Sequence, residues 1–184
     1  TNGTAFSLLY STLAKDGTWT EFQEFSVSLP DTSNPLVPSL VSVKGGDLLV
    51  FQAHYAPNDS YSFQLYSSFT KDNGATWSQP IMITNEGEQF RNYNNQRPVL
   101  LRNSDDVYLA WERSLTGSVT SSIYVCTLNA SGTLVNRSEQ VSARNGAREP
   151  EFFSYNENIY LIWADAQSNN NKVYLSEKKA SFWG

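Results

Sequence analysis

The sequence predicts an all-β fold, organised as a partial β-propeller of four-stranded antiparallel blades. Three observations lead to this prediction: a composition rich in strand-forming residues, a repeated strand–turn–strand unit, and a turn motif at a fixed place in that unit. Aromatic residues make up 14% of the 184 residues and hydrophobic residues 40%. Trp, Tyr, Phe, Thr and Val favour pleated, half-buried surfaces. No amphipathic helical pattern is visible.

The repeated unit occurs in three segments that align from their first residue: "PSLVSVKGGDLLVF" from Pro38, "PVLLRNSDDVYLAW" from Pro98 and "PEFFSYNENIYLIW" from Pro150. In each segment the proline stands thirteen residues before a large aromatic residue: Phe51, Trp111 or Trp163. A short apolar run follows the proline, then a turn rich in Gly, Asn, Asp or Ser, then alternating apolar residues. This pattern is typical of a β-hairpin.

Further strand-like segments extend each unit: "FQLYSSF", "SIYVCTL" and "KVYLSEK" as third strands, and "SQPIMIT" and "VNRSEQVS" as fourth strands. The N-terminal residues match only the second half of the unit, and the last unit breaks off at "SFWG". We therefore expect a half blade (1–33), two whole blades (34–86 and 87–142) and an incomplete blade (143–184) in a single propeller segment. The alternative is a β-sandwich of about a dozen strands.

The turn motif is "TKDNGATW", residues 70–77, between the third and fourth strands of one unit. Gly74 permits a backbone conformation that residues with a Cβ resist. Asp72, with Thr70 and Thr76, can hydrogen-bond the turn, and Trp77 can bury its ring between neighbouring sheets. These roles are structural rather than catalytic. Degenerate copies occur at "AKDGTW" (14–19) and "KKASFW" (178–183), and "NASGTL" keeps the turn residues without the Trp.

This motif resembles the Asp box, or BNR repeat, of the sialidase (neuraminidase) superfamily. The resemblance implies a propeller whose Asp boxes lie on the face away from the active site. Family propellers have six blades, whereas this chain contains about three and a half. It is therefore expected to be either a piece of a longer protein or one half of a ring completed by a second chain, as in a homodimer.

Composition and charge exclude several other classes of protein. The net charge is −5 and the sequence pI about 4.8, with no Lys/Arg run, which argues against nucleic acid as a partner. The apolar runs are too short to span a membrane. One cysteine (Cys126) and one histidine (His54) cannot form a Cys/His metal cluster, and no cofactor is predicted. The alternative is a structural Ca²⁺ in the Asp- and Asn-rich loops, although no EF-hand-like spacing is present. Four sequons, at Asn2, Asn58, Asn129 and Asn136, are close to the number expected by chance.

The start of the chain gives little information on localisation. No signal peptide is visible and the chain does not begin with Met, which indicates a processed chain or a segment.

Propeller topology predicts a site where residues before each repeated proline meet residues after each repeated aromatic. Arg97 directly precedes its proline and Arg148 stands one residue further back, so the two occupy nearly equivalent places in adjacent blades. Two guanidinium groups at one axis can grip a carboxylate. The alternative is that these loop charges are solvated or pair with one another. The other residues expected at this site are Gln52, Tyr55, His54, Asn94, Asn95, Gln96, Glu112, Arg113, Glu149 and Asp165.

The superfamily binds the sialic acid carboxylate with three arginines, uses a Tyr/Glu pair as nucleophile and an Asp as acid/base; a Tyr nucleophile departs from the two-carboxylate rule. Here "QRP" and "REP" replace the family's Phe/Tyr-Arg-Ile-Pro. Arg113, Arg91 and Arg144 are the choices for a third arginine, and Tyr93, Tyr55 and Glu149 for the Tyr/Glu pair. We expect substrate-binding roles for Arg97, Arg148, Arg113, His54, Tyr55 and Gln96, and acid/base roles for Asp165, Glu112 and Glu149.

Three functions remain open. The first is a non-catalytic propeller that binds carbohydrate, in particular an acidic sugar, on its central face, with arginines paired to Glu112, Glu149 or Asp165. The second is a sialidase-type glycosidase or a fragment of one, with Arg97 and Arg148 in a pocket beside a carboxylate and a Tyr. The third is a structural or protein-interaction fragment. A secreted or cell-surface setting fits the first two.

Overall fold

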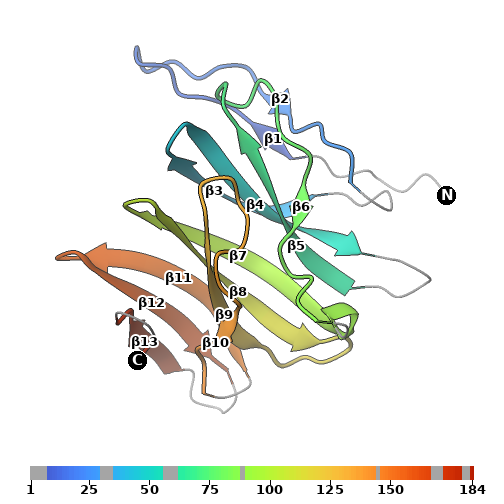
Figure 1. Ribbon diagram of the computed structural model, residues 1–184, viewed down its shortest axis with the longest axis vertical. Helices are drawn as coiled ribbons and strands as arrows, with labels where there is room; N and C mark the ends of the chain where they lie inside the picture. The colour runs from blue at the N-terminus through green and yellow to red at the C-terminus, as the bar shows by residue number, and fades with distance from the viewer. Residues whose placement is uncertain are drawn as a thin grey trace.

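A computed structural model describes residues 8–29, 35–55, 62–87, 90–143, 146–166, 172–179 and 183–184 of the chain. Within these residues the chain is all-β, with one short 3₁₀ turn, η3 (Phe90–Asn92), and no α-helix. The strands form four antiparallel sheets, which follow one another along the molecule (Figure 1). The predicted all-β, partial-propeller architecture is confirmed. Asn2, Asn58, Arg144 and residues 180–182 of the second degenerate turn motif lie outside the described residues.

Strand order within each sheet follows the order along the chain. The first sheet pairs β1 (Leu9–Tyr10) with β2 (Gln23–Glu24), and the second contains β3 (Leu36–Val43), β4 (Gly46–Tyr55), β5 (Ser62–Thr70) and β6 (Ile81–Met82). The third contains β7 (Tyr93–Asn103), β8 (Asp106–Leu115), β9 (Ser122–Leu128) and β10 (Glu139–Gln140). The fourth contains β11 (Ala147–Tyr155), β12 (Asn158–Asp165) and β13 (Lys172–Glu177). Such meanders are the blades of a propeller.

The hairpins that join the first two strands of each larger sheet have two-residue turns. Each turn contains at least one residue with a positive φ angle: Gly45 (91°), Ser104 (57°), and Asn156 (47°) with Glu157 (65°). A positive φ at the first turn residue, as at Ser104 and Asn156, matches the right-handed twist of the paired strands. In the turn before β4 the positive φ falls on the second residue, Gly45, which has no Cβ penalty there. The Gly, Asn, Asp and Ser residues between the two apolar runs of each repeat therefore serve to close a hairpin.

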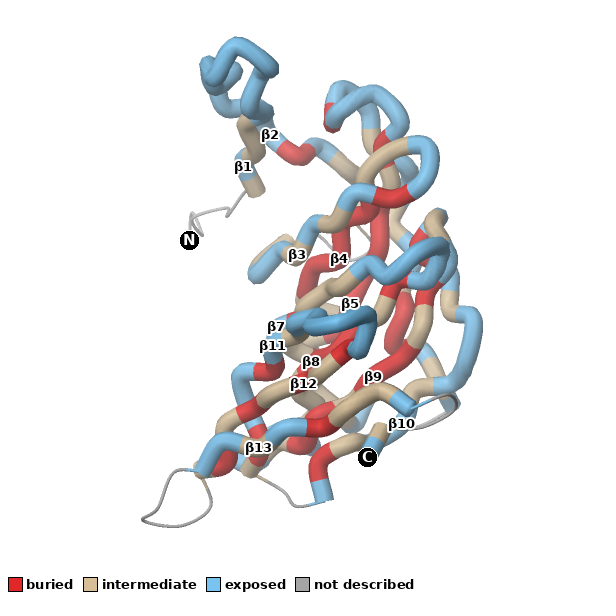
Figure 2. Tube along the Cα trace, turned by 90° about the vertical axis from the view of Figure 1, so that its left-hand side faces the viewer, coloured by how far each residue is buried: buried red, intermediate tan, exposed pale blue. Residues whose placement is uncertain are grey.

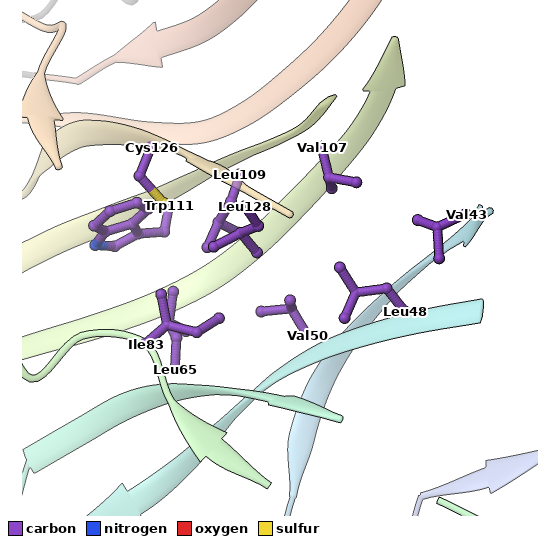
Figure 3. Close-up of a cluster of buried hydrophobic side chains, with 10 residues drawn as sticks. All are labelled: Val43, Leu48, Val50, Leu65, Ile83, Val107, Leu109, Trp111, Cys126 and Leu128. Carbon is purple, nitrogen blue, oxygen red and sulfur yellow. The ribbon is translucent and has the colours of Figure 1, made fainter. Parts of the chain in front are cut away.

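Apolar side chains pack between successive sheets. The largest cluster lies between the second and third sheets, with Leu48, Val50 and Leu65 on one side and Leu109 and Trp111 on the other (Figure 3). All five are almost completely buried. A second cluster joins the third sheet to the fourth, and a third joins the first sheet to the second. Buried residues concentrate in the middle strands of the sheets (Figure 2). The stack therefore depends on face-to-face contacts, each buried aliphatic or aromatic side chain contributing roughly 1.5–3 kcal/mol.

The fourth sheet leaves the far face of β13 uncovered. Val173 and Leu175 are 76% and 56% exposed, whereas Ile123 and Val125, at the same places in β9, are 0% and 2% exposed. The equivalence follows from the strand register, because Tyr124 pairs with Trp111 as Tyr174 pairs with Trp163. Within the described part of the chain, no further sheet packs on this face.

The "TKDNGATW" turn is held by hydrogen bonds to one carboxylate. Asp72 accepts the Thr76 amide at 2.8 Å, the Thr76 hydroxyl at 2.6 Å and the Thr70 hydroxyl at 2.8 Å. The φ of Gly74 is +92°, and a Cβ there would stand 2.6 Å from the Tyr10 ring. Trp77 packs edge-on against Phe25, with ring centroids 5.1 Å apart. The motif therefore fixes the contact between the first two sheets.

Asp72 should give the fold a measurable pH dependence. Hydrogen bonds from Thr76, and then Thr70, lower its pKa from 3.8 to about 2. Stability from a carboxylate with a depressed folded pKa is present above its unfolded pKa and is lost as the pH falls towards the folded pKa. We expect Asp72→Asn to have a lower Tm than the parent at pH 7, and the difference to shrink between about pH 4 and about pH 2. Thermal unfolding followed by circular dichroism measures this. Asp105→Asn, in an exposed hairpin turn, is the control, and a difference that does not vary with pH would contradict the expectation.

Candidate functional site

The innermost strands β3, β7 and β11 share an irregularity at the repeated proline. The strand register shifts in all three, between Leu36 and Ser39, between Gln96 and Val99, and between Arg148 and Glu151. The residue directly before each proline is left-handed: Val37 (φ 47°), Arg97 (53°) and Glu149 (56°). We call these three residues the bulge residues. A non-glycine residue in this region costs roughly 1–2 kcal/mol, and such strain is often retained at functional sites.

Two bulge residues are capped by side chains of the preceding sheet. Gln52 Oε1 accepts the backbone N–H of Arg97 at 2.9 Å, and Glu112 Oε1 accepts the backbone N–H of Glu149 at 2.7 Å. Gln52 and Glu112 hold the same place in their sheets, directly after Phe51 and Trp111. The third residue of this series is Ala164, which has no side-chain acceptor.

Glu112 also anchors a small cluster of charges. Arg97 Nη1 lies 3.2 Å from Glu112 Oε1 and 3.7 Å from Glu149 Oε1. The Glu112 side chain is 12% exposed, whereas those of Arg97 and Glu149 are 53% and 66% exposed. Exposed ion pairs contribute only about 0–1 kcal/mol to stability. The main effect of the cluster is therefore to orient Arg97 and Glu149.

The three bulges line one open cleft of about 540 Å³ at the meeting of β3, β7 and β11. Val37 and Pro38 give it exposed apolar surface, whereas Pro98 and Pro150 line it as buried residues. Arg97 offers hydrogen-bond donors, and the carboxylates of Glu149 and Glu151 offer acceptors. Chemically, the cleft can receive a ligand that combines an apolar face with hydroxyl groups.

Arg97 and Arg148 do not hold equivalent places. In the strand pairing, Gln96 faces Glu112 as Arg148 faces Ala164. Arg97 therefore corresponds to Glu149 and Arg148 to Gln96, so the one-residue offset that the sequence shows before the prolines is kept in the strand pairing. Arg148 is exposed. The described residues that line the cleft include Arg97 but neither Arg148 nor Gln96.

Arg113 lies in a different environment, in a polar network between the second and third sheets. Its Nε donates to Asn95 Oδ1 at 2.8 Å, the oxygen that also accepts Trp111 Nε1 at 2.7 Å. Its guanidinium stands 4.1 Å from the centre of the Tyr124 ring. Burial lowers the pKa of Arg113, while Tyr124 acts in the opposite direction. With Tyr93, Arg113 lines a separate cleft of about 210 Å³.

The remaining predicted residues also lie away from the bulges. Asp165 is buried and lines a hollow of about 280 Å³ beside Trp163 and Tyr174. The His54 ring packs on Phe63, 4.1 Å between centroids. Arg91 stands over the Tyr55 ring at 5.8 Å. Of the nine residues given substrate-binding or acid/base roles, the cleft and its charge cluster gather three: Arg97, Glu112 and Glu149.

The sequence reasoning missed two features of the cleft. It placed Gln52 near the site without recognising it as the counterpart of Glu112, although both follow the repeated aromatic. It also overlooked Val37 as the first bulge residue, although the position before each aligned proline could have been compared directly. The left-handed backbone has no sequence signal here, because none of the three residues is Gly, Asn or Asp.

No triad of His, Cys, Asp or Glu side chains suited to a metal ion is found in the described ranges. The same ranges contain no helix of the length and apolar character needed to cross a membrane.

Stacked antiparallel blades with an Asp-box turn and a cleft at their inner strands define the chain as a segment of a β-propeller. It belongs to the BNR repeat-like domain family, whose sequence profile matches residues 37–184. The predicted BNR/Asp-box-type propeller is thereby confirmed. No curated protein matches the sequence.

Solved structures with a similar fold include several glycoside hydrolases. An α-L-arabinofuranosidase from Lactobacillus brevis has a TM-score of 0.63 at 12% identity, over 95% of this chain and 68% of that chain. Zg3597, a family 117 glycoside hydrolase from Zobellia galactanivorans, has a TM-score of 0.58 at 12% identity, over 94% and 58%. The α-L-arabinofuranosidase Arb93a from Fusarium graminearum has a TM-score of 0.60 at 16% identity, over 90% and 53%. The chain thus spans between half and about two thirds of these proteins, and the likeness is one of fold.

The strain at the bulges can be tested at Glu149, whose φ is 56°. Glu149→Ala and Glu149→Gly both remove the ion pair with Arg97, but only glycine adopts a left-handed conformation without a Cβ penalty. We expect Glu149→Gly to be more stable than Glu149→Ala by about 1 kcal/mol. Urea unfolding measures the difference. At Glu151, which lies in β11 with no positive φ, the same pair should show the reverse order, and equal stability of the two Glu149 variants would contradict the strain.

Proposed function

We propose that this chain is the sugar-binding segment of a carbohydrate-active β-propeller, and that the cleft between the bulges holds a sugar ring. The observation that carries the proposal is the combination, in one cleft, of the exposed Val37 and Pro38 with Arg97 and Glu149, which Glu112 holds together. Sugars present a patch of C–H groups and a rim of hydroxyls. Exposed apolar side chains suit the former, and a mixed set of donors and acceptors suits the latter.

The charges favour a neutral sugar over the acidic sugar expected from a pair of arginines. Arg97 already faces two carboxylates, and Glu151 adds a third negative charge to the cleft. A carboxylate ligand would meet this repulsion and would have to compete for Arg97, whereas hydroxyl groups can bridge Arg97 and Glu149. The printed activities of two structural neighbours, both arabinofuranosidases, agree with a neutral sugar. A location outside the cell accords with such a ligand.

Hydrolysis is the second candidate function, and the observation that favours it is the closeness of two carboxylates. Paired glycosidase carboxylates stand roughly 5–10 Å apart. Glu112 Oε1 and Glu149 Oε1 lie 3.2 and 3.7 Å from Arg97 Nη1. The two carboxylates are therefore closer together than the upper limit of about 10 Å. Asp165, the third residue expected to act in acid/base chemistry, lines a different hollow.

The proposal is tested by titrating the chain with a neutral arabino-oligosaccharide and with sialyllactose. We expect the neutral sugar to bind, and Arg97→Ala to weaken binding about tenfold, as for loss of one charge-assisted hydrogen bond. Isothermal titration calorimetry measures both. Arg102→Ala is the matched control, because Arg102 lies on the same strand and donates to the Ser104 carbonyl at 2.8 Å, outside the cleft lining.

Absence of binding by either sugar, or equal affinity of the parent and Arg97→Ala, would overturn the proposal. If sialyllactose binds more tightly than the neutral sugar, and both Arg97→Ala and Arg148→Ala abolish its binding, the ligand is an acidic sugar instead. Hydrolysis of nitrophenyl arabinofuranoside with release of nitrophenol would favour the hydrolase, provided that Glu112→Gln and Glu149→Gln each abolish it.

A further inference from the structure

We propose that Gln52 and Glu112 are positioning residues of the cleft. Each accepts the backbone amide of a bulge residue in the next sheet and thereby holds that residue left-handed, with its side chain in the cleft. The effect of Gln52 and Glu112 on sugar binding rests on the proposed function. Their effect on the backbone of the bulge residues does not depend on any ligand.

The first observation is that the contact recurs in symmetric form. Gln52 belongs to β4 and caps Arg97 in β7, and Glu112 belongs to β8 and caps Glu149 in β11. Both are the first residue after the repeated aromatic, and both use Oε1 at hydrogen-bond distance, 2.9 and 2.7 Å. A contact that recurs in two successive pairs of sheets, with two different residue types, points to a common geometric role.

The second observation is where these side chains lie on their strands. Successive side chains of a strand alternate between its faces. Gln52 therefore shares a face with Leu48 and Val50, which are buried against the third sheet. Glu112 likewise shares a face with Ala110, which is buried against the fourth sheet. Each acceptor thus follows buried apolar residues on the same face of its strand and points at the adjoining sheet. There the bulge leaves a backbone amide that takes no part in the regular strand pairing.

The third observation is the strain that the contact offsets. Arg97 and Glu149 have φ angles of 53° and 56°, and neither is a glycine. A hydrogen bond to the amide of such a residue favours the strained backbone over an extended one, in which the amide would turn away. Glu112 adds a second restraint, because its carboxylate also lies 3.2 Å from Arg97 Nη1. One side chain therefore orients the bulge residues of two sheets.

Ala164 ends this series. It pairs with Arg148 as Glu112 pairs with Gln96, and its methyl group can accept no hydrogen bond. Within the described ranges, side-chain caps of this kind hold the bulges of Arg97 and Glu149. Arg97 and Glu149 are thus the polar side chains that the bulges present to the sugar, with Val37 contributing apolar surface.

Four variants separate the capping contact from charge. Gln52→Ala and Glu112→Ala remove the acceptor, whereas Gln52→Glu and Glu112→Gln keep an Oε1 in the same place and change only the charge. Amide hydrogen exchange by NMR should rise about tenfold at Arg97 in Gln52→Ala and at Glu149 in Glu112→Ala. It should return to the parent value in Gln52→Glu and Glu112→Gln. The ³J(HN,Hα) couplings of Arg97 and Glu149, which depend on φ, should change in the alanine variants alone.

Binding of the same arabino-oligosaccharide tests the consequence. Affinity should fall about tenfold in both alanine variants and be recovered in Gln52→Glu, which a general loss of stability would not predict. Ser67→Ala is the control, because it removes another contact between the second and third sheets, from Ser67 Oγ to the Gly132 carbonyl at 2.9 Å, away from the cleft. It should lower stability and leave exchange at Arg97 and Glu149 unchanged.

Unchanged exchange and couplings in the alanine variants would overturn the inference, as would faster exchange with undiminished sugar affinity. If the parent chain binds neither sugar, the proposed function fails. Exchange and couplings then decide alone whether Gln52 and Glu112 hold the bulges.

Discussion

Burial of apolar side chains between successive sheets is the interaction on which the rest of this chain depends. β4 carries Leu48 and Val50 on one face and Leu49 and Phe51 on the other, and all four are buried. A sheet that is apolar on both faces is stable only when both are covered. Stacking the sheets one after another satisfies this requirement and brings β3, β7 and β11 next to one another. The cleft is a consequence of that stacking.

The polar contacts of the cleft continue the apolar rows instead of interrupting them. After Leu48 and Val50, the next residue on the same face of β4 is Gln52, and its partner in the third sheet is an amide rather than a methyl group. On β7, Asn95 Oδ1 likewise accepts hydrogen bonds from the side chains of Trp111 and Arg113. Buried polar groups at these joints are thus matched to specific partners, which helps to fix how one sheet sits on the next.

Repetition made the fold predictable from the sequence. The spacing from Pro98 to Trp111 recurs in two other segments and fixes the hairpins, while the turn from Thr70 to Trp77 identifies the repeat type. The division into blades at residues 33, 86 and 142 stays a prediction. The charge cluster was predicted in part: Glu112 and Glu149 were expected to pair with an arginine, and they do pair with Arg97.

The other residues expected at the site lie elsewhere because the sequence does not show which face of each strand meets which sheet. Arg148 stands one residue further from its proline than Arg97 does, and the strand pairing accordingly makes Glu149 the counterpart of Arg97. Asp165 and Arg113 each lie two residues after the repeated aromatic, on the same face of the strand as that ring, and so join the interior between sheets. Counting along the chain could not separate these two faces without knowing which face meets which sheet.

The bulge residues have a consequence for how such a protein can change over evolutionary time. The backbone at these places requires a left-handed residue before a proline, but it does not require a particular side chain: valine, arginine and glutamate occupy the three positions of one chain. Substitutions there exchange a hydrophobic, cationic or anionic group in the cleft while the surrounding sheets keep their packing. Each duplication of a blade therefore adds one more position in the cleft at which the side chain can vary. Ligand preference can change at these positions through variants that all still fold.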